Sequence, residues 1–255
     1  MSWRDQLVER RVTGTHPRLG RAEIVQLVRR IVAGDPAARC GLELGDVSAE
    51  EVTQAAVECW GWTAERARGW IDPTRTVAAA AAARSRILEA GTAGARVAAA
   101  TAHPASLLGV HQHLLELAGA AGAKVVTCDR YGPVHVARRG RLSLWWVGSV
   151  ATATDGESIV GGELRELAAE WIFALGARPE LAIADGEFAG AAAHEGIEVI
   201  ALADLDALAL GVAAQRGLPV HVVPVVTSGP PDAYEVLFGG KPHGPDPQGA
   251  ERASQ

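Results

Sequence analysis

Apolar residues recur three and four positions apart through the first ninety residues, which is the spacing of one face of a helix. A capping box, S-x-x-E from Ser48 to Glu51, marks where one helix begins, because its side chains satisfy the first free backbone N–H groups. These signals predict a helical N-terminal portion over residues 1–92. Its four predicted helices are Trp3 to Arg11, Arg21 to Ala33, Ser48 to Trp60 and Asp72 to Glu89.

From Ala95 the pattern changes to short, nearly continuous apolar runs that alternate with helical segments. Strands of this kind are buried on both faces, so the alternation predicts a mostly parallel sheet covered by helices on either side. The predicted strands are ARVAAAT, AKVVTC, SVATAT, LAIA, IEVIALA and PVHVVPVV. The predicted helices are Ala105 to Ala121, Glu163 to Leu175, Phe188 to His194 and Asp206 to Gln215.

We therefore predict an α/β fold: a three-layer core with a mostly parallel sheet over residues 93–238, and the helical N-terminal portion packed on it. The pieces PVHVA and RLSLWWV interrupt the alternation, and RRGR between them predicts a turn. Residues 239–255 carry Gly, Pro and charges without periodicity, which predicts a disordered tail.

Composition and charge narrow the class of protein. The chain has 255 residues, of which 48% are hydrophobic and 21% are charged, and its formal net charge is −6. Its basic clusters are short, so we expect solvated faces there and no nucleic-acid partner. No apolar run reaches transmembrane length and no signal peptide is visible, so we expect no membrane contact. Three cysteines without CxxC spacing favour reduced thiols and a cytoplasmic location. The basic clusters are Arg29-Arg30 and Arg138-Arg139 with Arg141.

Polar residues stand where four of the predicted strands end. His103, Asp155, Asp185 and Asp204 follow such strands. Because the carboxyl ends of parallel strands line one edge of a sheet, where ligands bind in α/β folds, we expect these four side chains to converge. Clustered carboxylates repel one another, so we predict that Asp155, Asp185 and Asp204 ligate a divalent metal, Mg²⁺ or Mn²⁺. The alternative for each aspartate is a helix cap.

His103 precedes Pro104, which favours extended geometry at the histidine and places it where a strand turns into a helix. Its predicted role is a phosphate contact or acid–base catalysis, and the alternative is a buried, hydrogen-bonded histidine. We expect His16 and His194 at the surface. The predicted catalytic residues are Asp155, His103 and Asp185, and the predicted substrate-binding residues are Thr101, Ser106, Gly156, Ser158 and Glu187.

Several short segments between about Leu7 and Leu237 form a recognisable combination. They are RVTG with Pro17-Arg18, AGDP, GLELGD, Ile71-Asp72-Pro73, ATAHPASLL, Thr154-Asp155-Gly156 with Ser158, Ala184-Asp185 with Phe188 to Ala192, and Ala203-Asp204. Together they resemble a family of actinobacterial proteins catalogued as phosphatases. The resemblance implies a cytoplasmic α/β hydrolase whose partner is a small-molecule phosphate ester.

The chain also departs from the pattern of that family. Neutral and imidazole side chains of the pattern are missing, while the acidic residues at the strand ends remain. We therefore predict a phosphatase-like hydrolase of a small phosphorylated metabolite. The alternative is a catalytically impaired or repurposed paralogue that binds a small anionic metabolite or does other chemistry in specialised metabolism. A homodimer is left open. The departing segments are Leu19-Gly20-Arg21, Gly161-Gly162-Glu163, Asp185-Gly186-Glu187, Asp206 to Leu210 and Thr227-Ser228-Gly229.

Overall fold

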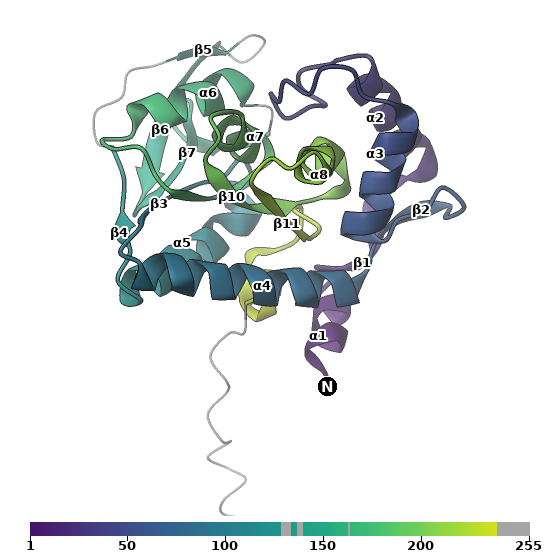
Figure 1. The fold of residues 1–255 in the computed structure, drawn as a ribbon, viewed down its shortest axis with the longest axis horizontal. Helices are drawn as coiled ribbons and strands as arrows, with labels where there is room; N and C mark the ends of the chain where they lie inside the picture. The colour runs from purple at the N-terminus through teal and green to yellow at the C-terminus, as the bar shows by residue number, and fades with distance from the viewer. Residues whose placement is uncertain (129–133, 137–139, 163, 239–255) are drawn as a thin grey trace, which may run out of the picture.

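The computed structural model describes residues 1–128, 134–136, 140–162 and 164–238 (Figure 1). The predicted disordered tail, residues 239–255, lies outside the described residues, as do Arg138 and Arg139 of the predicted turn. None of the helices in the described ranges is long and apolar enough to cross a membrane.

The centre of the molecule is a nine-stranded sheet, and it confirms the predicted α/β fold. Its main path runs β11 (Val220–Pro224), β10 (Glu198–Ala203), β9 (Leu181–Asp185), β3 (Arg96–Ala100), β7 (Val150–Thr154), β6 (Gly140–Val147) and β5 (Val134–Val136). The strands from β11 to β7 are parallel, and the short β4 (Lys124–Val125) runs parallel beside β3. Only β6, β5 and the short β8 (Ile159–Val160) pair antiparallel to their neighbours in this described sheet.

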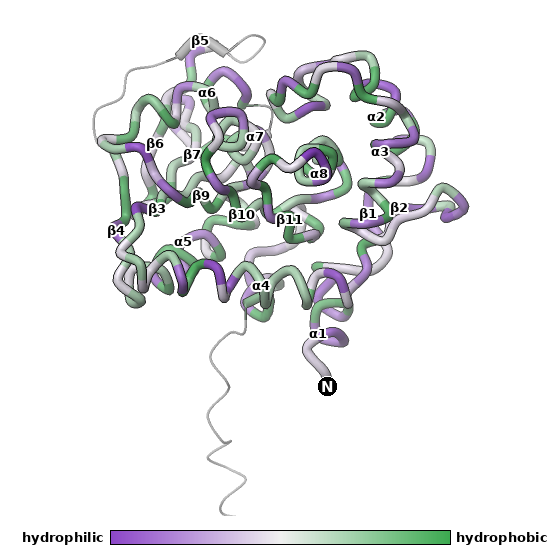
Figure 2. Tube along the Cα trace, viewed as in Figure 1, coloured by the Kyte–Doolittle hydropathy of each residue, from purple (hydrophilic) through white to green (hydrophobic). Residues whose placement is uncertain are grey.

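Two groups of helices cover the sheet. They are α4 (Pro73–Thr92) and α5 (Pro104–Ala120) on one face, and α6 (Arg165–Ala174), α7 (Gly186–His194) and α8 (Leu208–Gln215) on the other (Figure 1). Successive side chains of β3 point to opposite faces of the sheet. Val97 and Ala99 pack with the first group of helices, and Ala98 and Ala100 pack with the second. The central strands and α8 are mainly hydrophobic in Figure 2. The three predicted layers are therefore present, and α5 to α8 match their predicted positions to within a turn.

The first ninety residues are less helical than predicted. They contain α1 (Trp3–Glu9), α2 (Arg21–Val32), α3 (Ala49–Ala55) with a π-helical turn η1 (Ala56–Trp60), and nearly all of α4. They also contain β1 (Gly14–Gly20) and β2 (Arg68–Ile71), which pair antiparallel in a small separate sheet. The stretch GTHPRLG lacks helical spacing and carries a proline and two glycines, so it cannot continue a helix. Its partner strand lies about fifty residues away, which local periodicity does not reveal.

Trp60 joins this N-terminal region to the core. Its indole N–H donates a hydrogen bond to the Ala203 carbonyl at the end of β10, at 3.0 Å. Its ring lies against Gly211 of α8, where a Cβ would come within 2.7 Å of a ring atom. A glycine is therefore required for this close packing.

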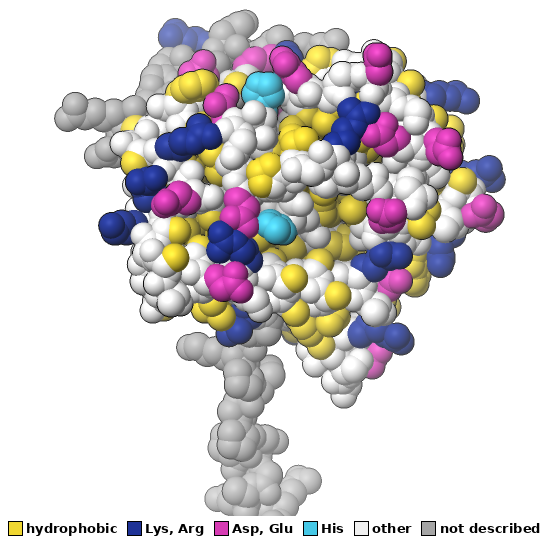
Figure 3. Space-filling view, viewed as in Figure 1, with side chains coloured by type: hydrophobic (Ala, Val, Ile, Leu, Met, Phe, Trp, Pro, Cys, Tyr) yellow, Lys and Arg dark blue, Asp and Glu magenta, His cyan; other side chains and the backbone are white. Residues whose placement is uncertain are grey.

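The surface of the molecule carries no patch of a single charge on the face shown in Figure 3. Acidic and basic side chains are interspersed on that face.

Candidate active site

Four parallel strands end at residues that the sequence singled out. Thr101 follows β3, Asp155 follows β7, Asp185 is the last residue of β9 and Asp204 follows β10. Because these strands are parallel, all four residues lie at the carboxyl edge of the sheet, as predicted. Their side chains nevertheless occupy different environments, which separates their chemistry.

Asp185 is fully buried and accepts hydrogen bonds on both oxygens. Its Oδ1 accepts from the backbone N–H of Ala102 and from Nδ1 of His103, each at 2.8 Å, and its Oδ2 accepts from the Thr101 hydroxyl at 2.5 Å. Although Asp185 is the N-cap residue of α7, its side chain makes no capping bond. Burial would raise the pKa of Asp185, but its hydrogen bond with His103 and the charges of His103 and His111 outweigh burial and lower it. Asp185 is therefore held as a carboxylate.

This carboxylate fixes the ring of His103 at the start of α5. Burial lowers the pKa of His103, but the hydrogen bond to Asp185 and the charges of Asp185, Asp206 and Glu187 outweigh burial and raise it to about 9. At neutral pH the ring therefore carries a proton on each nitrogen. Nδ1 donates to Asp185, and the ring, 27% exposed, lines a cavity. Among the described residues, none bonds the other ring nitrogen, so its N–H is available to a ligand.

His111 approaches the same carboxylate from within α5. Its Nδ1 lies 2.9 Å from the Leu107 carbonyl, and its Nε2 lies 3.4 Å from Oδ2 of Asp185. The ring is fully buried, and burial lowers the pKa of His111 although the nearby Asp185 charge opposes this. His113 is exposed on the same helix, so the two histidines face different directions.

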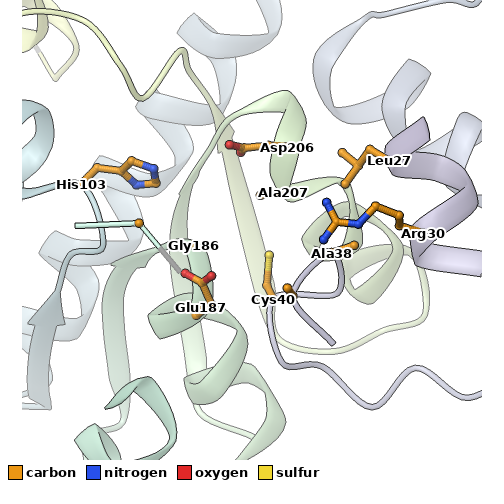
Figure 4. A pocket seen from close by; sticks show the side chains of 11 residues that line it. Leu27, Arg30, Ala38, Cys40, His103, Gly186, Glu187, Asp206 and Ala207 are labelled. Carbon is orange, nitrogen blue, oxygen red and sulfur yellow. The ribbon is translucent and has the colours of Figure 1, made fainter. Parts of the chain in front are cut away.

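A cavity of about 260 Å³ opens beside His103. His103, Glu187 and Asp206 line it from the strand-end side, and Arg30 and Cys40 line it from the N-terminal region. In Figure 4, Arg30 reaches into this space from the side opposite His103, and Glu187 and Asp206 lie between them. The N-terminal region therefore completes the site that the sheet edge begins.

The loop that carries Cys40 is seated directly on α7. A Cβ at Gly190 would lie 1.9 Å from the Cys40 carbonyl oxygen, so only glycine allows this contact. Burial, with the nearby charges of Glu187, Asp206 and Asp185, raises the pKa of the Cys40 thiol. A thiol of this kind stays protonated at neutral pH and is a poor nucleophile.

The two carboxyl groups of the cavity bind protons more readily than ordinary carboxyls. Burial raises the pKa of Glu187 to about 7, and the Asp185 and Asp206 charges add to this effect while His103 opposes it. Asp206 is an exposed residue that lines the cavity. Protein atoms packed around its carboxyl displace water, and this desolvation, with the charge of Asp204, raises the pKa of Asp206 to about 6. Either group can exchange a proton near neutral pH, which suits acid–base chemistry.

Asp204 belongs to a second buried Asp–His pair. Nε2 of His16 lies 3.0 and 3.1 Å from its two oxygens, and the same carboxylate accepts from the backbone N–H groups of Leu205 and Thr227. His16 is only 2% exposed, so the expectation of a surface position was wrong. The error arose because His16 lies on β1, which packs against the strand ends. The contacting residues, His16 and Asp204, are far apart in the sequence, so local pattern does not reveal the contact.

Asp155 lies in an exposed turn between β7 and β8. Its carboxylate accepts from the backbone N–H groups of Glu157 and Ser158 and from the Ser158 hydroxyl. These hydrogen bonds lower the pKa of Asp155. Gly156 and Ser158 are exposed in the same turn, and neither lines the cavity. β7 turns back here into a hairpin with β8, which was not predicted, before α6 begins near its predicted position.

The structure does not bring the three predicted metal ligands together. Both oxygens of Asp185 and Asp204 are already occupied by protein donors, and Asp155 is hydrogen-bonded within its own turn. Within the described ranges, no group of three or more His, Cys, Asp and Glu side chains is arranged to hold a metal ion. The chemistry of these donors therefore does not fit a site made of Asp155, Asp185 and Asp204.

Two predicted substrate-binding residues are buried instead. The Thr101 hydroxyl donates to Asp185 and accepts from the His103 backbone N–H at 3.0 Å, so it positions this pair. Ser106 is buried in the first turn of α5 and does not line the cavity. Glu187 does line it, and its role in substrate binding stays a prediction.

Arg30 and Asp206 are the charged residues of the cavity that sequence reasoning missed. Arg30 was assigned to a solvated face, because nothing local tells which of Arg29 and Arg30 turns toward the sheet edge. Asp206 follows Asp204 by two residues, and the sequence prediction chose Asp204 because it comes directly after the strand. One signal was available: Gly162, Gly186, Glu187 and Asp206 are all departures from the family pattern, and all line the cavity.

The fold and this site define an α/β protein with a strand-end cavity built around a buried Asp–His pair. Residues 1–239 match the family described as Phosphatase, and the chain belongs to that family. It is also 29% identical over 219 residues to Phosphatase SCO2771 of Streptomyces coelicolor, an alignment that covers 77% of this chain and 77% of that protein. No solved structure matches the chain.

Proposed function

We propose that this protein hydrolyses phosphate monoesters of small metabolites in the cavity beside His103. The observation that carries the proposal is the Asp185–His103 pair, which presents a protonated ring nitrogen to a cavity that Arg30 lines from the opposite side (Figure 4). Two cations around a small cavity suit a phosphate dianion. Membership of the Phosphatase family and the name of the Streptomyces relative support the class of reaction.

The start of α7 adds a second source of attraction for phosphate. The side chain of Asp185 leaves the first N–H groups of this helix uncapped, and Gly186 and Glu187 line the cavity. A helix N-terminus favours anions through these N–H groups and the helix dipole. Among the described residues, Arg30 bonds Asp35 only through its Nε, at 2.7 Å, which leaves its two terminal nitrogens available to a phosphate.

The chain's own residues can supply both proton transfers. A water oxygen attacks phosphorus while the Glu187 carboxylate takes one of its protons, and the bond from phosphorus to the ester oxygen breaks. Nε2–H of His103 gives its proton to that ester oxygen, so the alcohol leaves neutral. Inorganic phosphate remains, and Glu187 and His103 exchange protons with solvent to return to their starting states.

No step of this proposal is assigned to a metal. Mg²⁺ or Mn²⁺ stays a prediction from the sequence, and the donor set described above gives it no support at Asp155, Asp185 and Asp204. The assay below therefore includes metal and chelator arms.

The test is a steady-state assay of the purified full chain on phosphate esters, including para-nitrophenyl phosphate, with Mg²⁺, Mn²⁺ or EDTA. We expect turnover of at least one ester, slow on generic esters, because Gly162 and Gly186 offer only backbone N–H groups to the phosphate. His103→Asn should lower kcat/KM at least about 100-fold, since it removes the proton donor. His113→Asn is the matched control, because His113 is exposed on the same helix.

Two results would contradict the proposal. Turnover that survives His103→Asn would place the chemistry elsewhere. Phosphate binding without turnover of any ester would instead favour the alternative, a paralogue that binds a small anionic metabolite.

A further inference from the structure

A second cavity adjoins the first along α2. Its volume is about 480 Å³, and it shares Leu27, Arg30 and Asp206 with the first cavity. A molecule bound beside His103 can therefore extend past Leu27 into this space.

The two cavities differ in the chemistry of their walls. The residues that belong to the second cavity alone are mostly apolar, with Ile24 buried and Leu19 half-buried. Glu23 also lines it, but this carboxylate already accepts the Gly20 backbone N–H at 2.9 Å as the cap of α2. Gln26 is the other polar residue found in this cavity alone, and the rest of that part of its wall is apolar.

The charged groups lie where the cavities meet. Arg30 and Asp206 line both, whereas His103 and Glu187 line only the first. A ligand that satisfies both cavities is charged at one end and apolar along the rest. A phosphate ester of an apolar alcohol has this distribution, and a phosphorylated short polyol does not.

We infer that the second cavity binds the alcohol portion of the substrate, and that it selects esters with an apolar body of aromatic size over esters of small alcohols. This inference rests on the proposed function, because it takes the phosphate to lie beside His103. The cavity volume falls within the roughly 300–1,000 Å³ typical of small-molecule sites. Leu27 lies between the two cavities and is the residue that determines specificity.

The experiment compares phenyl phosphate with 2-naphthyl phosphate, whose leaving phenols are similar in acidity. We expect the wild-type chain to prefer the naphthyl ester roughly tenfold in kcat/KM, because its extra ring is buried against apolar side chains. Ala22→Phe, which fills the second cavity without touching the first, should lower this preference at least fivefold. Leu27→Gln should lower it as well. Arg29→Phe adds the same ring to an exposed position of α2 and should leave the preference unchanged.

Binding of the matching phosphonates, which cannot be hydrolysed, is measured in parallel by calorimetry. Tighter binding of the naphthyl compound that Ala22→Phe abolishes would support the inference even if no ester were turned over, a result that would contradict only the proposed function. Turnover of both esters with no naphthyl preference, or with a preference that Ala22→Phe and Leu27→Gln leave intact, would overturn the inference and leave the proposed function standing. The absence of both turnover and preferential binding would overturn both.

Discussion

Two Asp–His pairs lie at the ends of neighbouring parallel strands. They differ in whether the histidine keeps a ring nitrogen available to a ligand. Asp185 at the end of β9 pairs with His103, and Asp204 after β10 pairs with His16. Each carboxylate is buried and also accepts backbone N–H groups. From the aspartate side the two pairs look alike.

The histidines separate them. Nδ1 of His16 accepts from the backbone N–H groups of Arg18 and Leu19, at 3.1 and 2.8 Å, while its Nε2 donates to Asp204. Both nitrogens of His16 are therefore used by the protein. His103 uses one nitrogen for Asp185 and lines a cavity with the rest of its ring. The Asp204–His16 pair joins β1 to the strand ends, whereas the Asp185–His103 pair presents a ring to the cavity.

The largest expected effect comes from removing each carboxylate charge in turn. Asp185→Asn should lower kcat/KM for a phosphate ester on the order of 10³-fold, because the ring of His103 loses the group that orients it and holds its charge. Asp204→Asn should lower the melting temperature and leave kcat/KM of the folded protein within about threefold. Steady-state kinetics with a circular dichroism melt of each variant checks this.

The pH profile distinguishes a positioning role for Asp185 from general damage. In Asp185→Asn the pH at which activity falls should move from near 9 toward the usual 6.5 of histidine, since the charge that raises the pKa of His103 is gone. Equal losses of activity in folded Asp185→Asn and Asp204→Asn would end the distinction between the pairs.

The next effect concerns stability. His16→Ala leaves the buried Asp204 carboxylate without the hydrogen bond that Nε2 of His16 donates, and we expect the free energy of unfolding to fall by about 3 kcal/mol. The matched control is His221→Ala, because His221 also pairs with a carboxylate, Glu198 at 2.9 Å, but is half exposed. That change should cost less than about 1 kcal/mol. Denaturant titration of both variants measures the difference, and equal losses would count against a structural role for His16.

The fold could be predicted because its signals are local. Apolar runs such as LAIA and IEVIALA are readable as buried parallel strands, and the helices between them keep their spacing. The antiparallel pair of β1 and β2 was missed because both strands are short, irregular and far apart in the chain. Nothing in GTHPRLG itself specifies that RGWI will lie beside it.

The site could be predicted only in part, for the same reason. Topology alone places Asp155, Asp185 and Asp204 on one edge, but it does not say which carboxylates the protein itself will occupy. Asp185 and Asp204 accept donors contributed by distant segments, which leaves Glu187 and Asp206 as the carboxyl groups of the cavity. The position of a residue at the sheet edge can be predicted from its own strand alone. Its hydrogen-bond partners come from other segments, so they are known only from the packed structure.

A smaller effect tests the two proton-transfer roles. If Glu187 accepts a proton and His103 donates one, kcat/KM should rise about tenfold per pH unit below the Glu187 pKa of about 7, and fall similarly above the His103 pKa of about 9. Glu187→Gln should remove the rising limb, and the exposed Glu157→Gln should not. A profile without limbs in this range would exclude these roles. Other titratable or charged groups also lie near Glu187 and His103, namely His111, Asp185, Asp206 and Arg30. Because the pKa of Asp206 is about 6, Asp206→Asn is a further check that the rising limb belongs to Glu187.

The smallest effect follows from His103 in the resting protein. Its pKa is about 9 in the folded chain and near 6.5 when unfolded, so the folded state binds more protons between these values. The stabilisation is therefore complete below about pH 6.5 and is lost as pH rises through 9. Near pH 8 the slope comes chiefly from His103, because Glu187 and Asp206 are then mostly ionised in both states. The thiols of Cys40 and Cys59, whose pKa values burial raises, are still mostly protonated in both states at this pH. We expect the free energy of unfolding to fall there by at most about 1.4 kcal/mol per pH unit, measured by denaturant titration. His103→Asn should remove most of this slope, and His16→Ala should keep it, because both nitrogens of His16 make hydrogen bonds within the protein and neither lines the cavity. A slope that persists in His103→Asn would mean that another group carries it, and that the two pairs differ less than their geometry indicates.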